Sequence, residues 1–176
     1  KTTSGNNAAA SGAGAPDAAH GISKLNFIME RRDKITDYYD AENANIGAGS
    51  YGSVSKAKRK ETGAIVAIKK ISKVQVKNVD RFKLEIQIMK LLDHPNIIKL
   101  FEHFEDHKNI YLVMELCDGS ELFDRIIDEG RLTERQTAII MRQVFRALSY
   151  MHEQRIMHRD LKPENFLFST KESVET

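Results

Sequence analysis

The chain has 176 residues, of which 41% are hydrophobic and 30% are charged, a composition typical of a soluble globular domain. Its 27 basic and 25 acidic residues leave a net charge of +2, so overall charge provides no strong attraction to nucleic acid or to a membrane surface. The single cysteine, Cys117, excludes an internal disulfide and a cysteine-based zinc site. It also favours a reducing, intracellular compartment, which we take to be the cytoplasm.

No apolar run approaches the ~18 residues of a transmembrane helix, and the first residues do not form a signal-peptide pattern. The chain begins at Lys1 rather than at Met. Membrane contact in the full-length parent is therefore expected only through an N-terminal acylation signal outside these residues.

Two regions precede the first regular elements. Residues 1–23 consist mostly of Ala, Gly, Ser and Asn, and such a segment buries too little apolar surface to offset its ordering entropy. We therefore expect residues 1–23 to form a disordered, low-complexity tail. Large apolar side chains begin after Lys24, and we interpret residues 24–37 as an N-terminal extension of the folded part.

Hydrophobic periodicity predicts the elements that follow. Between residues 39 and 71 the pattern is three strands, separated by a glycine run and by the turn at residues 61–63. Residues 79 to about 92 have the period of a helix with a wide apolar face, formed by Phe82, Leu84, Ile86, Ile88, Met89 and Leu91. Two further apolar runs, at 97–104 and 110–114, predict a hairpin.

The last third of the chain is predicted to be helical. A short helix around residues 121–128 ends at Gly130, a suitable C-cap. Thr133 and Gln136 form a capping-box pattern that begins a longer helix, with an apolar face made of Met141, Val144, Leu148 and Met151.

The glycine run at residues 47–54 fits the pattern GxGxxGxV, whose glycines allow backbone amides to approach phosphate oxygens. A dinucleotide-binding fold would begin a helix at the third glycine, but Gly52 is followed by strand-like alternation. A P-loop would contain Gly-Lys-Ser/Thr, but here Gly52 precedes Ser53. Two interpretations remain: a glycine-rich hairpin over a nucleotide, or an ordinary flexible β-turn.

Lys69 ends the buried run at residues 66–69, a position where a lysine alone indicates no more than a solvated strand end. Glu85 falls on the predicted helix face beside Leu84 and Ile88, so we expect its carboxylate to point toward the core. Because a buried carboxylate needs a partner, and Lys69 is the available cation, we predict that these two residues form an ion pair. The pair would fix the position of the Lys69 side chain so that it can bind phosphate groups.

The octet at residues 158–165, His-Arg-Asp-Leu-Lys-Pro-Glu-Asn, concentrates acidic, basic and amide side chains, and Pro163 excludes an ordinary helix there. Phosphoryl transfer requires groups that orient a hydroxyl, accept its proton, neutralise phosphate charge and hold a metal ion. Asp160, Lys162 and Asn165 suit these tasks. Considered alone, the octet fits a polar loop after a helix equally well.

GxGxxGxV, Val-Ala-Ile-Lys, a helix glutamate and His-Arg-Asp-Leu-Lys-Pro-Glu-Asn occur in the order seen in eukaryotic protein kinases, which the chain resembles over about residues 38–168. The resemblance implies an α+β fold: a five-stranded antiparallel N-lobe sheet with the αC helix, followed by the first helices of an incomplete helical C-lobe. The N-lobe would be residues 38–114, the hinge 115–120, and the start of the C-lobe 121–176.

The resemblance also implies roles, with ATP and Mg²⁺ as cofactors and proteins or peptides as substrates. Asp160 would be the catalytic base, Lys162 the γ-phosphate contact and Asn165 a magnesium ligand, with Lys69 and Glu85 the ion pair of the active state. The nucleotide site would comprise Gly47, Ala48, Gly49, Ser50, Tyr51, Gly52, Val54, Ala67, Lys69, Met114, Glu115, Cys117, Glu121 and Leu167.

Within that set, the adenine pocket would have walls of Val54, Ala67 and Leu167. Met114 would be the gatekeeper, although simple core packing explains it too. Residues 115–117 would offer backbone groups to adenine.

Finer features resemble one subgroup. Lys162, two residues after Asp160, has the spacing of serine/threonine kinases. Glu121 with Glu164 resembles the acidic pair with which calmodulin-dependent-type kinases select substrates that carry an upstream arginine, although Glu121 also suits the first turn of its helix. Segments at 27–28, 35–39, 121–124, 147–152 and 163–167 look like calcium-dependent protein kinases of apicomplexans and plants. Those kinases carry EF-hands after the kinase domain, so calcium is expected only there, because this chain has no Asp-x-Asp-x-Asp-Gly loop.

The chain contains no Asp-Phe-Gly and no Ala-Pro-Glu sequence. Two-metal phosphoryl transfer needs the first of these motifs, so the fragment alone is predicted to be inactive and its parent an active kinase. The alternative is a nucleotide-binding pseudokinase or scaffold, usually marked by loss of Lys69, Asp160 or Asn165, all present here. If the chain were instead an unrelated binding module, ATP analogues would give the Lys69 side chain no protection. Without the rest of a helical lobe, Met141, Val144 and Leu148 are expected to be partly exposed.

Overall fold

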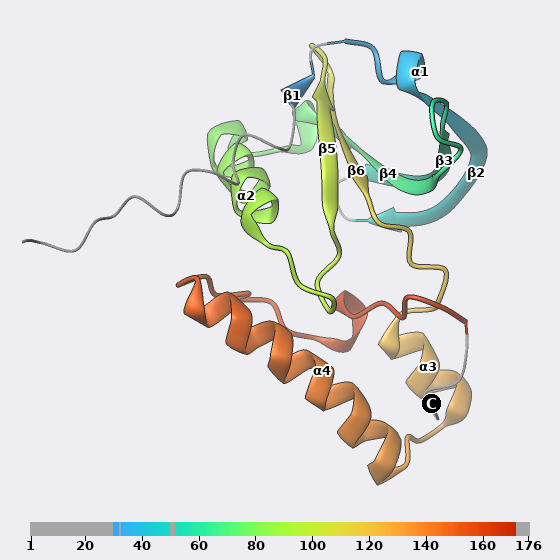
Figure 1. The fold of residues 1–176 in the computed structure, drawn as a ribbon, viewed down its shortest axis with the longest axis vertical. Helices are drawn as coiled ribbons and strands as arrows, with labels where there is room; N and C mark the ends of the chain where they lie inside the picture. The colour runs from blue at the N-terminus through green and yellow to red at the C-terminus, as the bar shows by residue number, and fades with distance from the viewer. Residues whose placement is uncertain (1–29, 32, 50–51, 172–176) are drawn as a thin grey trace, which may run out of the picture.

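A computed structural model describes residues 30–31, 33–49 and 52–171. The predicted disordered tail and the start of the extension at Lys24 lie outside the described residues. A twisted sheet with one helix at its side forms the first part of the molecule, and two helices below it, followed by a long loop, form the second (Figure 1).

The sheet has six strands in the order β1-β5-β6-β4-β3-β2. Its strands are β1 (Glu30–Arg31), β2 (Tyr39–Gly49), β3 (Gly52–Arg59), β4 (Ile65–Ser72), β5 (Leu100–Glu105) and β6 (Asn109–Met114). Strands β2 to β6 pair antiparallel, which confirms the predicted five-stranded sheet. Strand β1 is an addition that was not predicted, because two residues are too few to show alternation, and it pairs parallel with β5.

One apolar cluster packs on each of the two faces of this sheet. The first contains Tyr39, Ala57, Val66, Ile68, Phe104 and Val113. The second contains Ile71, Ile86, Leu100, Ile110 and Leu112. Because side chains alternate along a strand, Val66 and Ile68 of β4 face the first cluster, while Lys69 shares the face of Ile71 and the second cluster.

Helix α2 (Val79–Leu91) lies beside the sheet (Figure 1) and contributes Ile86 to the second cluster. It begins at Asn78, whose Oδ1 accepts a hydrogen bond from the backbone N–H of Arg81 at 2.9 Å. Ile86 is buried, and Phe82 and Met89 pack beside it. Leu84 is 60% exposed, so the prediction of a wide apolar face is wrong on that side. Only the narrower stripe that meets the sheet is covered.

The second part contains α3 (Leu122–Glu129) and α4 (Glu134–Glu153). Gly130 ends α3 with a φ of +71°, which confirms the predicted C-cap. The capping box that begins α4 is also confirmed: Thr133 Oγ1 accepts from the N–H of Gln136, whose Oε1 accepts from the N–H of Thr133. Short helical turns occur at α1 (Ile35–Tyr38), η1 (Lys73–Gln75) and η2 (Pro163–Asn165).

The apolar face of α4 is only partly covered, as predicted. Ile140 and Met151 are buried, Val144 and Leu148 are half-buried, and Met141 is 37% exposed. None of the helices in the described ranges is long and apolar enough to cross a membrane.

Candidate active site

The glycine pattern lies where β2 meets β3, and Gly49 pairs with Gly52 across the two strands. A Cβ added to Gly52 would lie 1.8 Å from the carbonyl oxygen of Lys70, so only glycine fits this close approach to β4. Gly47 pairs with Val54. The predicted contacts Ser50 and Tyr51 lie outside the described residues.

The predicted adenine pocket is built on β3, β4 and β6. Val54 pairs with Lys69, and Ala67 pairs with Met114. Ala67 is buried, and Met114 packs against the second apolar cluster. Met114 therefore contributes to the core at the position predicted for a gatekeeper, so the two interpretations of this residue are compatible.

The predicted hinge runs alongside the segment that follows the catalytic octet. Gly119 donates its N–H to the carbonyl of Phe168 at 3.1 Å, and Leu122 donates to Phe166 at 2.8 Å. Phe168 donates in turn to Ser120 at 3.1 Å, and Glu121 forms a β-bridge with Leu167. This ladder brings Leu167, which is 45% exposed, to the hinge from a position 46 residues beyond Glu121 in the chain.

Two hinge residues have well-defined surroundings. The backbone N–H of Glu115 donates to the carbonyl of Lys99 at 2.9 Å, which fixes the strand end. Burial, with the nearby charges of Glu115 and Asp118, raises the pKa of the Cys117 thiol. The thiol is therefore less ionised, and less reactive, than that of a free cysteine.

The predicted ion pair between Lys69 and Glu85 is not formed. Glu85 lies at the solvent side of α2, with its side chain 57% exposed and its Oε1 3.8 Å from Nε of Arg81. No ion pair between described residues joins Glu85 to Lys69. The prediction that Glu85 faces the core is wrong, because Phe82, Ile86 and Met89 occupy the face toward the sheet and leave Glu85 at its edge.

The octet forms a compact polar arrangement. Asn165 donates its Nδ2 to both the backbone carbonyl and Oδ2 of Asp160, at 2.7 and 2.9 Å. Lys162 Nζ lies 3.3 Å from the same Oδ2. The pKa of the exposed Asp160 carboxyl is lowered, mainly by the hydrogen bond from Asn165 and next by the hydrogen bond from Lys162. The structure therefore brings together the three residues that the sequence selected.

The backbone of this loop is constrained. Arg159 has a φ of +66°, an uncommon value for a residue with a Cβ, and such conformations cluster at functional sites. Asp160 follows, and its N–H donates to Nδ1 of His158 at 3.3 Å. The turn η2 (Pro163–Asn165) then returns Asn165 to Asp160.

The donor set of this loop fits a magnesium ion bound together with phosphate. Mg²⁺ prefers oxygen ligands and is usually held by one or two side chains plus phosphate oxygens rather than by a protein cage. The Oδ1 atoms of Asn165 and Asp160 take part in none of the contacts given above, so both are available as oxygen ligands. Within the described ranges no group of three or more His, Cys, Asp or Glu residues could hold a metal alone.

One contact beside the site was missed by the sequence reasoning. The guanidinium carbon of Arg125 on α3 lies 4.8 Å from the ring centroid of Phe168. Arg125 also pairs with Glu129 at 3.2 Å. The spacing of four residues between Arg125 and Glu129 could have indicated the ion pair, but no local pattern links Arg125 to Phe168.

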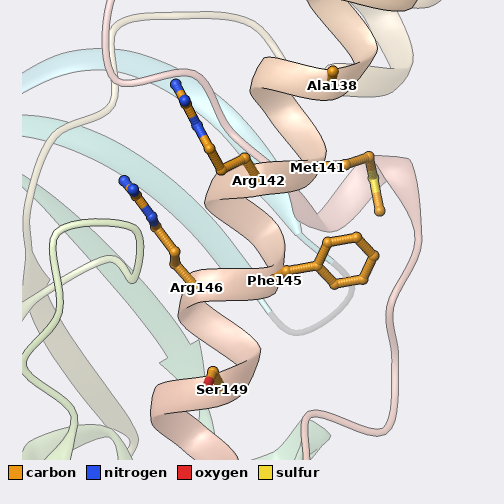
Figure 2. A pocket seen from close by; sticks show the side chains of 6 residues that line it. All are labelled: Ala138, Met141, Arg142, Phe145, Arg146 and Ser149. Atoms are coloured by element: carbon orange, nitrogen blue, oxygen red, sulfur yellow. The ribbon is translucent and has the colours of Figure 1, made fainter.

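A hollow on the outer face of α4 is separate from this site (Figure 2). Met141 and Phe145 project together on one side of it, and the side chains of Arg142 and Arg146 extend side by side in another direction. It contains none of the predicted site residues, and of its lining residues Met141 also belongs to the partly covered apolar face of α4.

The two-part fold, the glycine-lined strands and the Asp160 loop are together those of a protein kinase domain. The protein kinase domain family matches residues 41–175, and the chain belongs to this family.

Among similar proteins, Calcium-dependent protein kinase 5 of Plasmodium falciparum (isolate 3D7) is 52% identical over 142 residues, which are 81% of this chain and 25% of the relative. Calcium-dependent protein kinase 3 of Plasmodium yoelii yoelii is 48% identical over 150 residues, or 85% of this chain and 28% of the relative. The chain therefore spans about a quarter of the length of these curated relatives. Its resemblance to calcium-dependent protein kinases is confirmed.

Among solved structures, the twitchin kinase fragment of C. elegans, an autoregulated protein kinase with immunoglobulin domains, matches with a TM-score of 0.74 and 35% identity. The match covers 84% of this chain and 33% of that one.

Proposed function

We propose that the full-length protein carrying these residues uses ATP and Mg²⁺ to phosphorylate serine or threonine residues of proteins. The observation that carries this proposal is the arrangement of Asp160, Lys162 and Asn165 on one constrained loop. Membership of the protein kinase family and similarity to calcium-dependent protein kinases support it. The name of those relatives also supports calcium regulation of the whole protein.

The mechanism assigns a separate task to each group of the loop. The Asp160 carboxylate orients the substrate hydroxyl and accepts its proton, and its lowered pKa keeps it ionised. Lys162 neutralises charge on the transferred phosphoryl group, and Asn165 Oδ1 provides a metal ligand. Mg²⁺, when bound, offsets the negative charge of the phosphates.

Lys69 is the residue that would hold the nucleotide phosphates from the other side of the site. It lies on β4 opposite Val54, next to the close contact made by Gly52. An active kinase pairs this lysine with the helix glutamate, whereas Glu85 here pairs with Arg81. We therefore interpret the described arrangement as one in which Glu85 must exchange Arg81 for Lys69 before transfer.

Three finer proposals concern substrate and context. Glu121 and Glu164 would select substrates with an upstream arginine, since Glu164 is part of the loop, Glu121 bridges to Leu167 just after it, and both carry negative charge. The protein would act in the cytoplasm, with any membrane association provided by residues outside this chain. The 176-residue chain by itself would bind nucleotide without transferring phosphate, because it lacks an Asp-Phe-Gly sequence.

Calorimetric titration of the 176-residue chain with ADP, with and without Mg²⁺, tests the nucleotide site. We expect Lys69→Met to weaken ADP binding by about tenfold, the loss of roughly 1.4 kcal/mol that a hydrogen bond to a charged group provides. Lys70→Met is the matched control, because Lys70 is exposed on the opposite face of β4. Equal effects of the two variants, or no binding by the unaltered chain, would refute the proposed site.

Phosphate transfer from ATP to a peptide with an upstream arginine tests the reaction. The full-length protein should transfer phosphate and lose transfer on Asp160→Asn while ADP binding persists. The 176-residue chain should show no transfer. Binding without transfer by the full-length protein would instead support the pseudokinase alternative.

A further inference from the structure

The contact between Arg125 and Phe168 joins two segments that both carry predicted site residues: the hinge with the start of α3, and the residues that follow the catalytic loop. Arg125 lies in the first turn of α3, directly after the hinge, and its N–H donates to the carbonyl of Glu121 at 3.1 Å. Phe168 lies three residues after Asn165 and next to Leu167. The guanidinium over the ring therefore connects the helix that follows the hinge to the extended segment that follows the catalytic loop.

The surroundings make this contact stronger than an exposed one. The side chain of Arg125 is only 16% exposed, and Glu129 Oε1 accepts a hydrogen bond from its Nη1 at 3.2 Å. A partly desolvated guanidinium is attracted to a ring face more strongly than one in water. Its pairing with Glu129 also limits the orientations that the guanidinium can adopt.

The backbone around the stack is closely fitted. A Cβ on Gly119 would lie 2.5 Å from Cβ and from the carbonyl oxygen of Phe168, so the two segments touch through their main chains. Four hydrogen bonds cross between residues 118–122 and 166–169, and Phe168 makes two of them. A small displacement of Phe168 would therefore displace Leu167 and loosen the return of Asn165 to Asp160.

We propose that Arg125 is a positioning residue for the nucleotide site: by stacking on Phe168 it holds residues 166–169 against residues 118–122, and so sets Leu167 and Asn165 relative to the hinge. Arg125 itself does not contact the nucleotide. Its effect on nucleotide binding rests on the proposed function, whereas its effect on the backbone ladder does not.

Two readouts on the 176-residue chain test this proposal: hydrogen exchange of the Gly119, Leu122 and Phe168 amides, and ADP affinity in the presence of Mg²⁺. Arg125→Met keeps the length of the side chain and removes its charge, and Phe168→Leu removes the ring. Each variant should speed exchange of these amides, and raise the Kd for ADP, by about threefold to tenfold, as the loss of a partly desolvated cation–π contact implies. The double variant should be no worse than the more affected single variant, because both remove one interaction.

Two further variants separate positioning from general stability. Arg125→Lys retains a cation and should restore at least half of the lost ADP affinity. Arg135→Met, which removes an exposed arginine on α4, should change neither readout.

The outcomes are distinct. Unchanged amide exchange in Arg125→Met overturns the proposal whether or not ADP binds. Faster exchange with unchanged ADP affinity also overturns it, because Arg125 would then have a structural role only. Failure of the unaltered chain to bind ADP is the result that contradicts the proposed function itself.

Discussion

At the scale of single residues, Gly52 is the position of the glycine pattern at which backbone atoms leave no room for a side chain. A Cβ at this position would lie 1.8 Å from the carbonyl oxygen of Lys70 and 2.9 Å from the carbonyl carbon. Both obstacles are backbone atoms of β4, which cannot rotate away as the end of a side chain can. The third glycine of the pattern is thus required by the sheet itself, in addition to any phosphate that the strands bind.

Gly47, the first glycine of the same pattern, provides a matched comparison. A Cβ there would meet only Cβ of Val54, at 4.0 Å, an ordinary van der Waals contact. We expect Gly52→Ala to lower the free energy of unfolding by about 2 kcal/mol, the usual cost of forcing an extra methyl group into a filled site. Gly47→Ala should change it by less than about 0.5 kcal/mol, and urea denaturation of the two variants measures both values. Similar losses would show that the contact with Lys70 is easily relieved.

At the scale of elements, Glu105 of β5 adds a polar link between α2 and the sheet. Its Oε1 lies 2.7 Å from Nζ of Lys73, and its Oε2 lies 3.2 Å from Nζ of Lys83 on α2. The hydrogen bond from Lys73, assisted by the one from Lys83, lowers the pKa of Glu105 despite its partial burial. One carboxylate thus links η1, which follows β4, to β5 and to the helix that carries Glu85.

The lowered pKa predicts a pH-dependent contribution to stability. A carboxyl group whose pKa is lower in the folded than in the unfolded state stabilises the fold above the unfolded pKa, and this stabilisation is lost as the pH falls through the folded pKa. We expect Glu105→Gln to lower the free energy of unfolding by about 0.5–1 kcal/mol at pH 7, the range of a partly exposed ion pair. The difference from the unaltered chain should shrink as the pH is lowered from 5 toward 3.

Urea titrations at several pH values measure this difference. Glu61→Gln is the control, because Glu61 is 80% exposed and reaches only Arg59, at 3.7 Å, so its replacement should have little effect at any pH. A cost of Glu105→Gln that stays constant between pH 7 and pH 3 would rule out a contribution from the carboxylate charge.

The elements also show what sequence reasoning can and cannot reach. Signals within a few residues, such as the Thr133 capping box and the period of α2, predicted their elements correctly. The predicted direction of the Glu85 side chain was wrong because that direction depends on how the sheet packs against α2. Helical spacing alone does not decide whether a residue at the edge of the apolar face points to the core or to solvent. The contact of Arg125 with Phe168 depends on a ladder between distant segments, for which no local pattern exists.

At the scale of the whole molecule, apolar burial is distributed unevenly. Both apolar clusters lie in the sheet and α2. The described helical part buries only Leu122, Ile140 and Met151, and the outer face of α4 exposes Phe145 (Figure 2). Regions with few buried apolar contacts open at lower free energy than a well-packed core, so α4 depends on its connections to the first part of the molecule.

Tyr150 provides one such connection. Its hydroxyl accepts a hydrogen bond from the N–H of Asp93 at 3.0 Å and donates to the carbonyl of Leu91 at 3.4 Å. Its ring stacks on His94, with centroids 5.3 Å apart. The end of α2 and the turn after it are therefore fastened to the last third of α4.

Native-state hydrogen exchange tests this dependence of α4 on the first part of the molecule. In the unaltered chain we expect the amides of β4 and β6 to be the best protected and those of α4 to exchange through a lower-energy opening. Tyr150→Phe keeps the ring stack and removes both hydrogen bonds, so it should lower protection in α4 by about fivefold, corresponding to roughly 1 kcal/mol. Protection in β4 and β6 should change much less.

Tyr111→Phe is the matched control for this experiment, because the Tyr111 hydroxyl donates to Oδ2 of Asp106 at 3.1 Å within the β5–β6 hairpin. Its removal should loosen that hairpin and leave α4 unchanged. If Tyr150→Phe instead lowered protection equally in α4, β4 and β6, the two parts would open as a single cooperative unit. The sheet would then share its stability with the helices, in spite of the uneven burial.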